Sequence, residues 1–239
     1  MLKSLDERLI LIGVAHVLPK SIAEVKTTIL RERPEIVGVE LCPTRYMALT
    51  SGVRGVKGKA VPPGQFRLAI LNKLLYYLQR RVARQTGMPA GEEMLVAIHS
   101  SRKVGSRLEL LDQEISTTLQ RLVDRMGWGE KLRLGVELLL SLLPLGKRIE
   151  IEKVTEEQVV KRLLSELKRT SPTAYEVLIQ ERNEYMASKI LKLLATSSGK
   201  VVCVVGAGHV PGLHQKLSAS LREAPAKPWE SFRISWEQA

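Results

Sequence analysis

The most constraining stretch of this sequence is a run of five apolar residues, Val201 to Val205, that leads directly into Gly206-Ala207-Gly208-His209. A strand without polar residues is typical of a sheet that is buried on both faces, as parallel sheets are. Because Gly206 and Gly208 have no Cβ, the backbone there can turn tightly and a ligand can approach it closely. We therefore expect His209 at the carboxyl end of a buried strand.

The beginning of the chain repeats this arrangement. Residues 9–12 are apolar and lead into Gly13-Val14-Ala15-His16. A helix should follow, because Ser21 and Glu24 form a capping box and Pro34 marks its end. Residues 35–41 are again typical of a buried strand. Strand, helix and strand in succession predict a βαβ unit with parallel strands, so Glu40 should reach the same edge of the sheet as His16.

Four predicted strands thus end in ionisable residues, since residues 107–112 form a further short strand that ends at Asp112. His16, Glu40, Asp112 and His209 should meet at the carboxyl edge, where open α/β sheets bind ligands. This set suits a divalent metal. It equally suits a metal-free pair in which one histidine removes a proton and Glu40 orients it. Each residue also has a structural interpretation: Glu40 can pair with an arginine, and Asp112 can cap the helix expected near Ile115.

Arginines add a second class of candidate. Arg45, Arg121 and Arg182 can bind a carboxylate or phosphate, since a guanidinium pairs with such groups in a bidentate manner. Arg182 directly follows Glu181, so a structural ion pair explains it equally well. The glycines at 206 and 208 do not predict a dinucleotide site, because the third glycine of that fingerprint is missing.

Composition limits the class of protein and its partners. A chain of 239 residues with 44% hydrophobic and 26% charged residues predicts one globular domain over 1–239, with mainly helical insertions at 50–105 and 113–196 and a tail at 225–239. The net charge of +12 suits nucleic acid, but an aromatic content of 4% leaves few residues for base stacking and argues against such a partner.

Other features predict the compartment and the assembly. No apolar stretch approaches the roughly 18 residues that a membrane span needs. Two cysteines are too few to staple a domain of this size, so a reducing, cytoplasmic location is expected. The leucine-rich residues 138–145 and the tryptophan-containing tail are apolar enough for a subunit interface, and a homodimer is the predicted assembly.

Taken together, these motifs resemble those of the TraB/PrgY/GumN family, over roughly residues 9 to 213. The matching segments are Gly13-Val14-Ala15-His16-Val17, Val39-Glu40-Leu41-Cys42 with Arg45, Gly91-Glu92-Glu93-Met94, Glu181-Arg182-Asn183 and Gly206-Ala207-Gly208-His209-Val210-Pro211-Gly212. One departure is Gln113, which stands where the family commonly has arginine.

The resemblance implies an α/β fold with a central, mostly parallel sheet built from βαβ units, a large helical insertion and a core like that of erythromycin esterases and ChaN. It also implies hydrolysis, since the related Tiki enzymes are metal-dependent proteases. Their paired Gly-x-x-His motifs and their glutamate correspond here to His16, His209 and Glu40.

The leading hypothesis from the sequence is a metal-dependent peptidase that acts on a peptide or small-molecule substrate. His16, Glu40 and His209 would hold Mn²⁺, Co²⁺ or Zn²⁺, and the ion would activate a water molecule. Glu181 or Asp112 would orient that water. The substrate would lie against the three arginines, Gly13, Gly206 and Gly208. The alternative is a non-catalytic module that sequesters a peptide, as pheromone shutdown would require.

Overall fold

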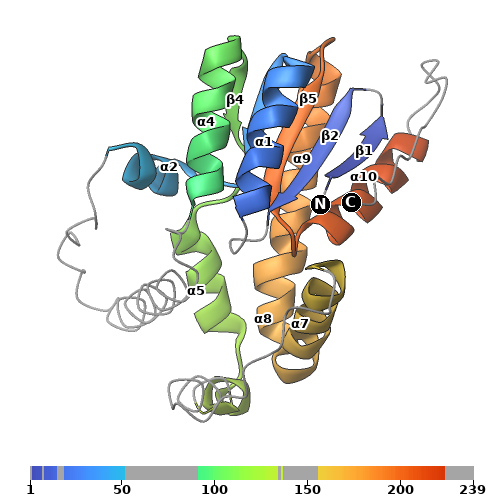
Figure 1. The fold of residues 1–239 in the computed structure, drawn as a ribbon. Helices are drawn as coiled ribbons and strands as arrows, with labels where there is room; N and C mark the ends of the chain where they lie inside the picture. The colour runs from blue at the N-terminus through green and yellow to red at the C-terminus, as the bar shows by residue number, and fades with distance from the viewer. Residues whose placement is uncertain are drawn as a thin grey trace.

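The computed structural model describes residues 2–6, 8–14, 19–51, 91–133, 136 and 156–223, and within them five strands form one sheet (Figure 1). The strands are β1 (Leu2–Asp6), β2 (Leu9–Val14), β3 (Ile36–Val39), β4 (Arg107–Leu110) and β5 (Val201–Gly206), in the order β1-β2-β5-β3-β4. The first strand is antiparallel to β2, and every other pairing is parallel. The predicted α/β class with a mostly parallel sheet is confirmed.

Strand β5 comes last along the chain but lies in the middle of the sheet. It pairs with β2, where Gly13 faces Val205, and with β3, where Val39 faces Val204. The predicted βαβ unit therefore has parallel strands, as expected, but β2 and β3 do not touch because β5 separates them. This insertion places the residue after β3, Glu40, beside the end of β5.

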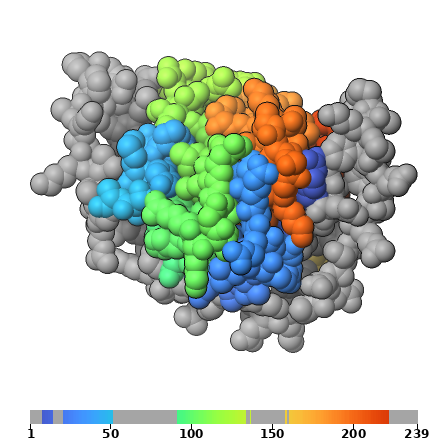
Figure 2. All heavy atoms as spheres, turned by 90° about the horizontal axis from the view of Figure 1, so that it is seen from above, coloured from blue at the N-terminus to red at the C-terminus, as the bar shows by residue number. Residues whose placement is uncertain are grey.

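Two pairs of helices cover the sheet and make a three-layer structure. Helices α1 (Pro19–Glu32) and α4 (Glu92–Val104) pack side by side on one face, as Figures 1 and 2 show. Helices α9 (Glu181–Thr196) and α10 (Val210–Glu223) cover the other. Alternate residues of β5 contribute to the two layers: Val202 and Val204 belong to the first core, and Val201, Cys203 and Val205 belong to the second. Burial on both faces explains why this strand has no polar residue.

The start of α1 differs from the prediction. The helix begins at Pro19, so Ser21 lies inside it and does not cap its first turn. Proline is well suited to this first position, because its fixed φ matches the helix and its missing N–H would have no partner there. The end agrees with the prediction, since the helix stops at Glu32, before Pro34.

A group of helices lies beyond the carboxyl ends of the parallel strands (Figure 1). It contains α5 (Ile115–Arg125), α7 (Glu156–Thr170), α8 (Pro172–Tyr175) and a π-helix, η2 (Glu176–Gln180), that runs directly into α9. Its small core consists of Leu122, Met126, Ala174 and Val177. Helix α8 begins with Ser171 as N-cap, which accepts a hydrogen bond from the backbone N–H of Ala174, and with Pro172 at the first position.

The remaining predictions concern other parts of the chain. A short helix, α2 (Pro43–Thr50), follows β3. Residues 52–90, most of the first predicted insertion, and the predicted tail at 225–239 lie outside the described residues. Among the helices that the structure does describe, none has the length and apolar character needed to cross a bilayer.

Candidate functional site

Glu40 occupies the centre of the carboxyl edge and is buried, with 8% of its surface exposed. Its backbone N–H donates to the carbonyl of Val204, so the residue extends the pairing of β3 with β5. One carboxylate oxygen, Oε2, accepts from the N–H of Gly206 at 2.5 Å. The other, Oε1, accepts from Nη2 of Arg182 at 2.5 Å and lies 3.4 Å from Nε2 of His209.

Gly206 permits this close approach. A Cβ at that position would lie 3.1 Å from Oε2 of Glu40 and 3.7 Å from Cδ2 of His209. The residue is not in the left-handed backbone region, since the described glycines with positive φ are Gly91 and Gly105. Because Gly206 has no side chain, the carboxylate of Glu40 can lie against the end of β5.

Arg182 of α9 joins Glu40 to Asp112. Its Nε and Nη2 donate to the two oxygens of Asp112 at 3.0 and 2.9 Å, and its Nη1 donates to the carbonyl of Leu178 at 3.2 Å. Burial opposes the charge of Arg182, but Glu40 and Asp112 outweigh this effect and raise its pKa. The guanidinium is thus a permanent, largely buried cation that bridges two buried carboxylates.

The same partners determine the charge of Glu40. Burial by itself raises the pKa of the Glu40 carboxyl. The charge and hydrogen bond of His209, the charge of Arg182 and the amide of Gly206 act in the opposite direction and are stronger together, so the pKa lies well below its usual range. Glu40 is therefore a carboxylate across the physiological pH range.

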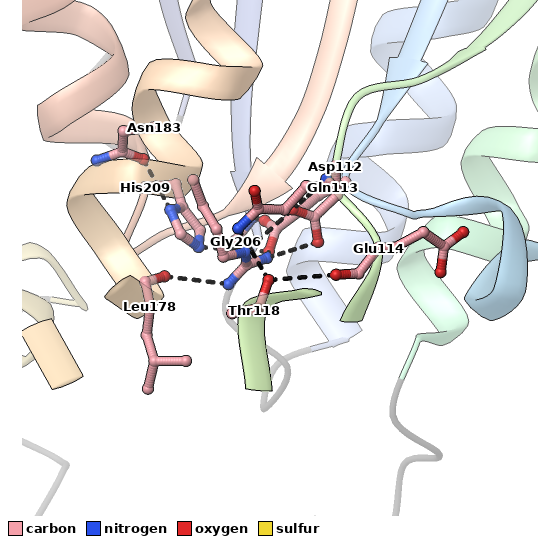
Figure 3. A network of polar contacts seen from close by, with 10 residues as sticks. Asp112, Gln113, Glu114, Thr118, Leu178, Asn183, Gly206 and His209 are labelled. Carbon is pink, nitrogen blue, oxygen red and sulfur yellow. Dashed lines mark hydrogen bonds and ion pairs between the residues drawn. The ribbon is translucent and has the colours of Figure 1, made fainter. Parts of the chain in front are cut away.

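His209 lies between Glu40 and a side chain of the neighbouring helix. It occupies the turn between β5 and α10 and is 5% exposed. Its Nδ1 lies 2.7 Å from Oδ1 of Asn183, which is 3% exposed (Figure 3). Its Nε2 lies 3.4 Å from Oε1 of Glu40. Both ring nitrogens therefore have a polar neighbour, and the orientation of the imidazole is defined from two sides.

Three consecutive residues of α9 reach three different parts of the site. Successive helix residues point about 100° apart. Glu181 pairs with Arg121 (2.9 Å) and Arg125 of α5, Arg182 faces the strand ends, and Asn183 faces His209. The π-helix immediately before them widens the backbone, a feature that occurs frequently at functional sites.

The predicted residues thus fall into two groups. Glu40, Asp112, Arg182, Gly206 and His209 form one network, which contains the arginine pairing anticipated for Glu40. Asp112 does not cap α5, because the residue at the N-cap is Glu114 and Asp112 accepts from Arg182 and from the backbone N–H of Gln113. Glu181 and Arg121 lie beside this network and pair with each other.

Glu181 and Arg121 also line an open hollow of about 600 Å³ between α5 and α9, whose other lining residues are Gln113, Glu114, Thr117, Glu184, Tyr185 and Ser188. Within the described ranges, no hydrogen bond or ion pair links Arg45 of α2 to the network. Gly13 lies in β2 opposite Val205, and a Cβ added at Gly208 would lie 3.7 Å from Cδ2 of Leu164. His16 lies outside the described residues.

Asn183 contacts His209 but was not among the site residues predicted from the sequence. The sequence contains a signal for it, since the chain has two asparagines and this one follows Glu181-Arg182 directly. Its importance becomes clear only when α9 packs against the turn after β5, because the contact with His209 spans 26 residues.

The donor atoms of the described network do not fit a divalent ion. No group of three His, Cys, Asp or Glu side chains within the described ranges is arranged to hold a metal. The reason is visible in the contacts, since a guanidinium lies between the two carboxylates and the second oxygen of Glu40 accepts from a backbone amide. A metal site would require His16 as well, so the divalent ion stays a prediction.

The fold and the site define the class of protein: a three-layer α/β protein with a buried histidine, carboxylates and arginine at the carboxyl edge of its sheet. The model of the TraB/PrgY/gumN family matches residues 2–227, and the chain belongs to this family.

Curated relatives agree with this family but are longer than this chain. An uncharacterized protein of Methanocaldococcus jannaschii is 36% identical over 208 residues, which is 85% of this chain and 51% of the relative. TraB domain-containing proteins of mouse and human are each 26% identical over 240 residues, covering 90% of this chain and 64% of theirs. The chain thus spans about half to two thirds of these relatives. The solved structure of Campylobacter jejuni ChaN with cofacial heme covers 87% of this chain and 75% of its own, at a TM-score of 0.37 and 13% identity.

Proposed function

We propose that this chain is a hydrolase that cleaves a peptide or a small acyl compound, with His209 as general base at the carboxyl edge of the sheet. The observation that carries the proposal is the buried imidazole between Glu40 and Asn183. A histidine whose orientation is set by hydrogen-bonding partners, next to a carboxylate, is the arrangement that general acid–base catalysis needs.

The proposed reaction uses the described residues as follows. His209 takes a proton from a water molecule while the water oxygen forms a bond to the carbonyl carbon of the substrate. The bond from that carbon to the leaving nitrogen or oxygen then breaks, and the imidazolium returns the proton to the leaving group. Glu40 stabilises the imidazolium while it carries the proton, and Arg182 holds Glu40 in place.

The predicted metal-dependent peptidase is a finer form of the same proposal. It adds a divalent ion held with the help of His16. The contacts of the described residues do not include a role for that ion. Turnover must therefore be measured with and without it.

Replacing His209 by glutamine tests the proposal. The enzyme should be screened against acetylated peptide pools, read by mass spectrometry, and against simple esters, with chelator and with added Mn²⁺, Co²⁺ or Zn²⁺. We expect His209→Gln to lower the rate of any hydrolysis found by about 10²- to 10⁴-fold, because the proton acceptor is lost.

The matched control is His99→Gln, since His99 is exposed on α4 and takes no part in the network. Equal rates for the wild type and His209→Gln would remove this residue from catalysis. Saturable peptide binding with no turnover under any of these conditions would favour the sequestering module instead.

A further inference from the structure

We propose that Asn183 and Gly212 are positioning residues that hold the imidazole of His209 in one orientation, with a proton on Nδ1. The catalytic meaning of this assignment rests on the proposed function, but the assignment itself is a property of the resting protein.

The two contacts of the imidazole are unequal. The distance of 2.7 Å between Nδ1 and Oδ1 of Asn183 is that of a full hydrogen bond, whereas 3.4 Å between Nε2 and Oε1 of Glu40 is longer than usual. An amide oxygen only accepts, so Nδ1 must donate. The short contact therefore keeps a proton on Nδ1.

Gly212 of α10 controls where the Asn183 side chain can lie. A Cβ at position 212 would be 2.2 Å from Nδ2 of Asn183, closer than two such atoms can approach, and 3.2 Å from its Cγ, which is a tight contact. The asparagine is 3% exposed and short, so it cannot yield without moving its amide oxygen away from His209. The glycine therefore provides the space that the hydrogen bond to Nδ1 requires.

Gly208 provides a matched control in the same segment. A Cβ there would approach a methyl carbon of Leu164 at 3.7 Å, which is ordinary van der Waals contact. Gly208→Ala thus adds the same methyl group only four residues away, without displacing Asn183.

The experiment is nitrogen-15 NMR of protein labelled at its histidines. The chain has four of them, and a His209→Gln sample assigns the signal of His209. In the wild type and in Gly208→Ala we expect Nδ1 to show the shift of a protonated nitrogen at every pH at which the protein is folded. In Gly212→Ala we expect this signal to move toward the average of the two neutral tautomers.

Two results would overturn the proposal: an unprotonated Nδ1 in the wild type, or a Gly212→Ala spectrum of His209 that matches the wild type. If Gly212→Ala does not fold, a second pair of variants decides the question. Asn183→Asp keeps an accepting oxygen at the same place and should keep Nδ1 protonated, whereas Asn183→Leu should not. Equal His209 signals in these two variants would contradict the proposal as well.

This measurement uses no substrate, so its outcome is separable from that of the hydrolysis assay. A protonated Nδ1 that depends on Gly212 in a protein without turnover would keep the positioning role and reject the hydrolase. Turnover that depends on His209 in a protein with an unprotonated Nδ1 would keep the hydrolase and reject the positioning role.

Discussion

Arg182→Met is expected to lower the free energy of unfolding by about 3–5 kcal/mol, the usual loss when one partner of a buried ion pair is removed. Methionine fills most of the volume but leaves Glu40 and Asp112, both nearly fully buried, without the cation that contacts them. Urea unfolding followed by circular dichroism at pH 7 measures the loss.

The control for this prediction is Arg125→Met. Arg125 also contacts two carboxylates, those of Glu176 and Glu181, but it lies at the surface, where water and salt screen the interaction. Its replacement should change the stability by only a small fraction of the Arg182 effect. Similar losses in the free energy of unfolding for Arg182→Met and Arg125→Met would show that the buried position of Arg182 does not increase its contribution to stability.

Glu40→Gln is expected to destabilise the protein by about 1.5–3 kcal/mol at neutral pH, the range for hydrogen bonds to charged groups. The effect should shrink as the pH falls. The pKa of Glu40 is lowered in the folded protein, so its charged form contributes stability above the ordinary carboxyl pKa, and this contribution disappears as the pH drops through the folded-state value. Wild type and variant should therefore converge in acid.

The measurement is a series of urea unfolding curves from pH 7 down to the lowest pH at which the wild type still folds. Glu166→Gln is the control, because Glu166 is 60% exposed and its nearest arginine nitrogen is 3.9 Å away. That variant should follow the wild type at every pH. A Glu40→Gln deficit that stays constant, or that grows in acid, would contradict the charge assigned to this carboxyl group.

Both predictions concern contacts that local sequence patterns do not contain. The hydrogen bond from Arg182 to Glu40 joins residues 142 positions apart, and the pair to Asp112 spans 70. Arginine pairing was one of the interpretations open for Glu40, yet no periodicity shows which arginine is near. The same limit applies to Asn183, because strand β5 lies between it and its partner His209 in the sequence.

Some predictions about local structure were also incomplete. No strand was predicted at residues 2–6, where β1 pairs with β2. Leu2-Lys3-Ser4-Leu5-Asp6 is too short and too polar to show the pattern of a buried strand, and an edge strand does not need that pattern. Ser21 had the spacing of a capping box, but the helix takes Pro19 as its first residue because proline is itself a favourable start.

The sequence by itself determined the parallel α/β class and placed Glu40, Asp112 and His209 at the carboxyl ends of their strands. These features depend on short-range rules, since a strand that is buried on both faces is apolar and ends where its apolar run ends. Only the tertiary structure decided that β5 enters between β2 and β3, and that Arg182 and Asn183 reach the residues at those ends. Strand order and ion pairing result from packing between distant segments, where many residues of suitable type compete and geometry alone selects the partner.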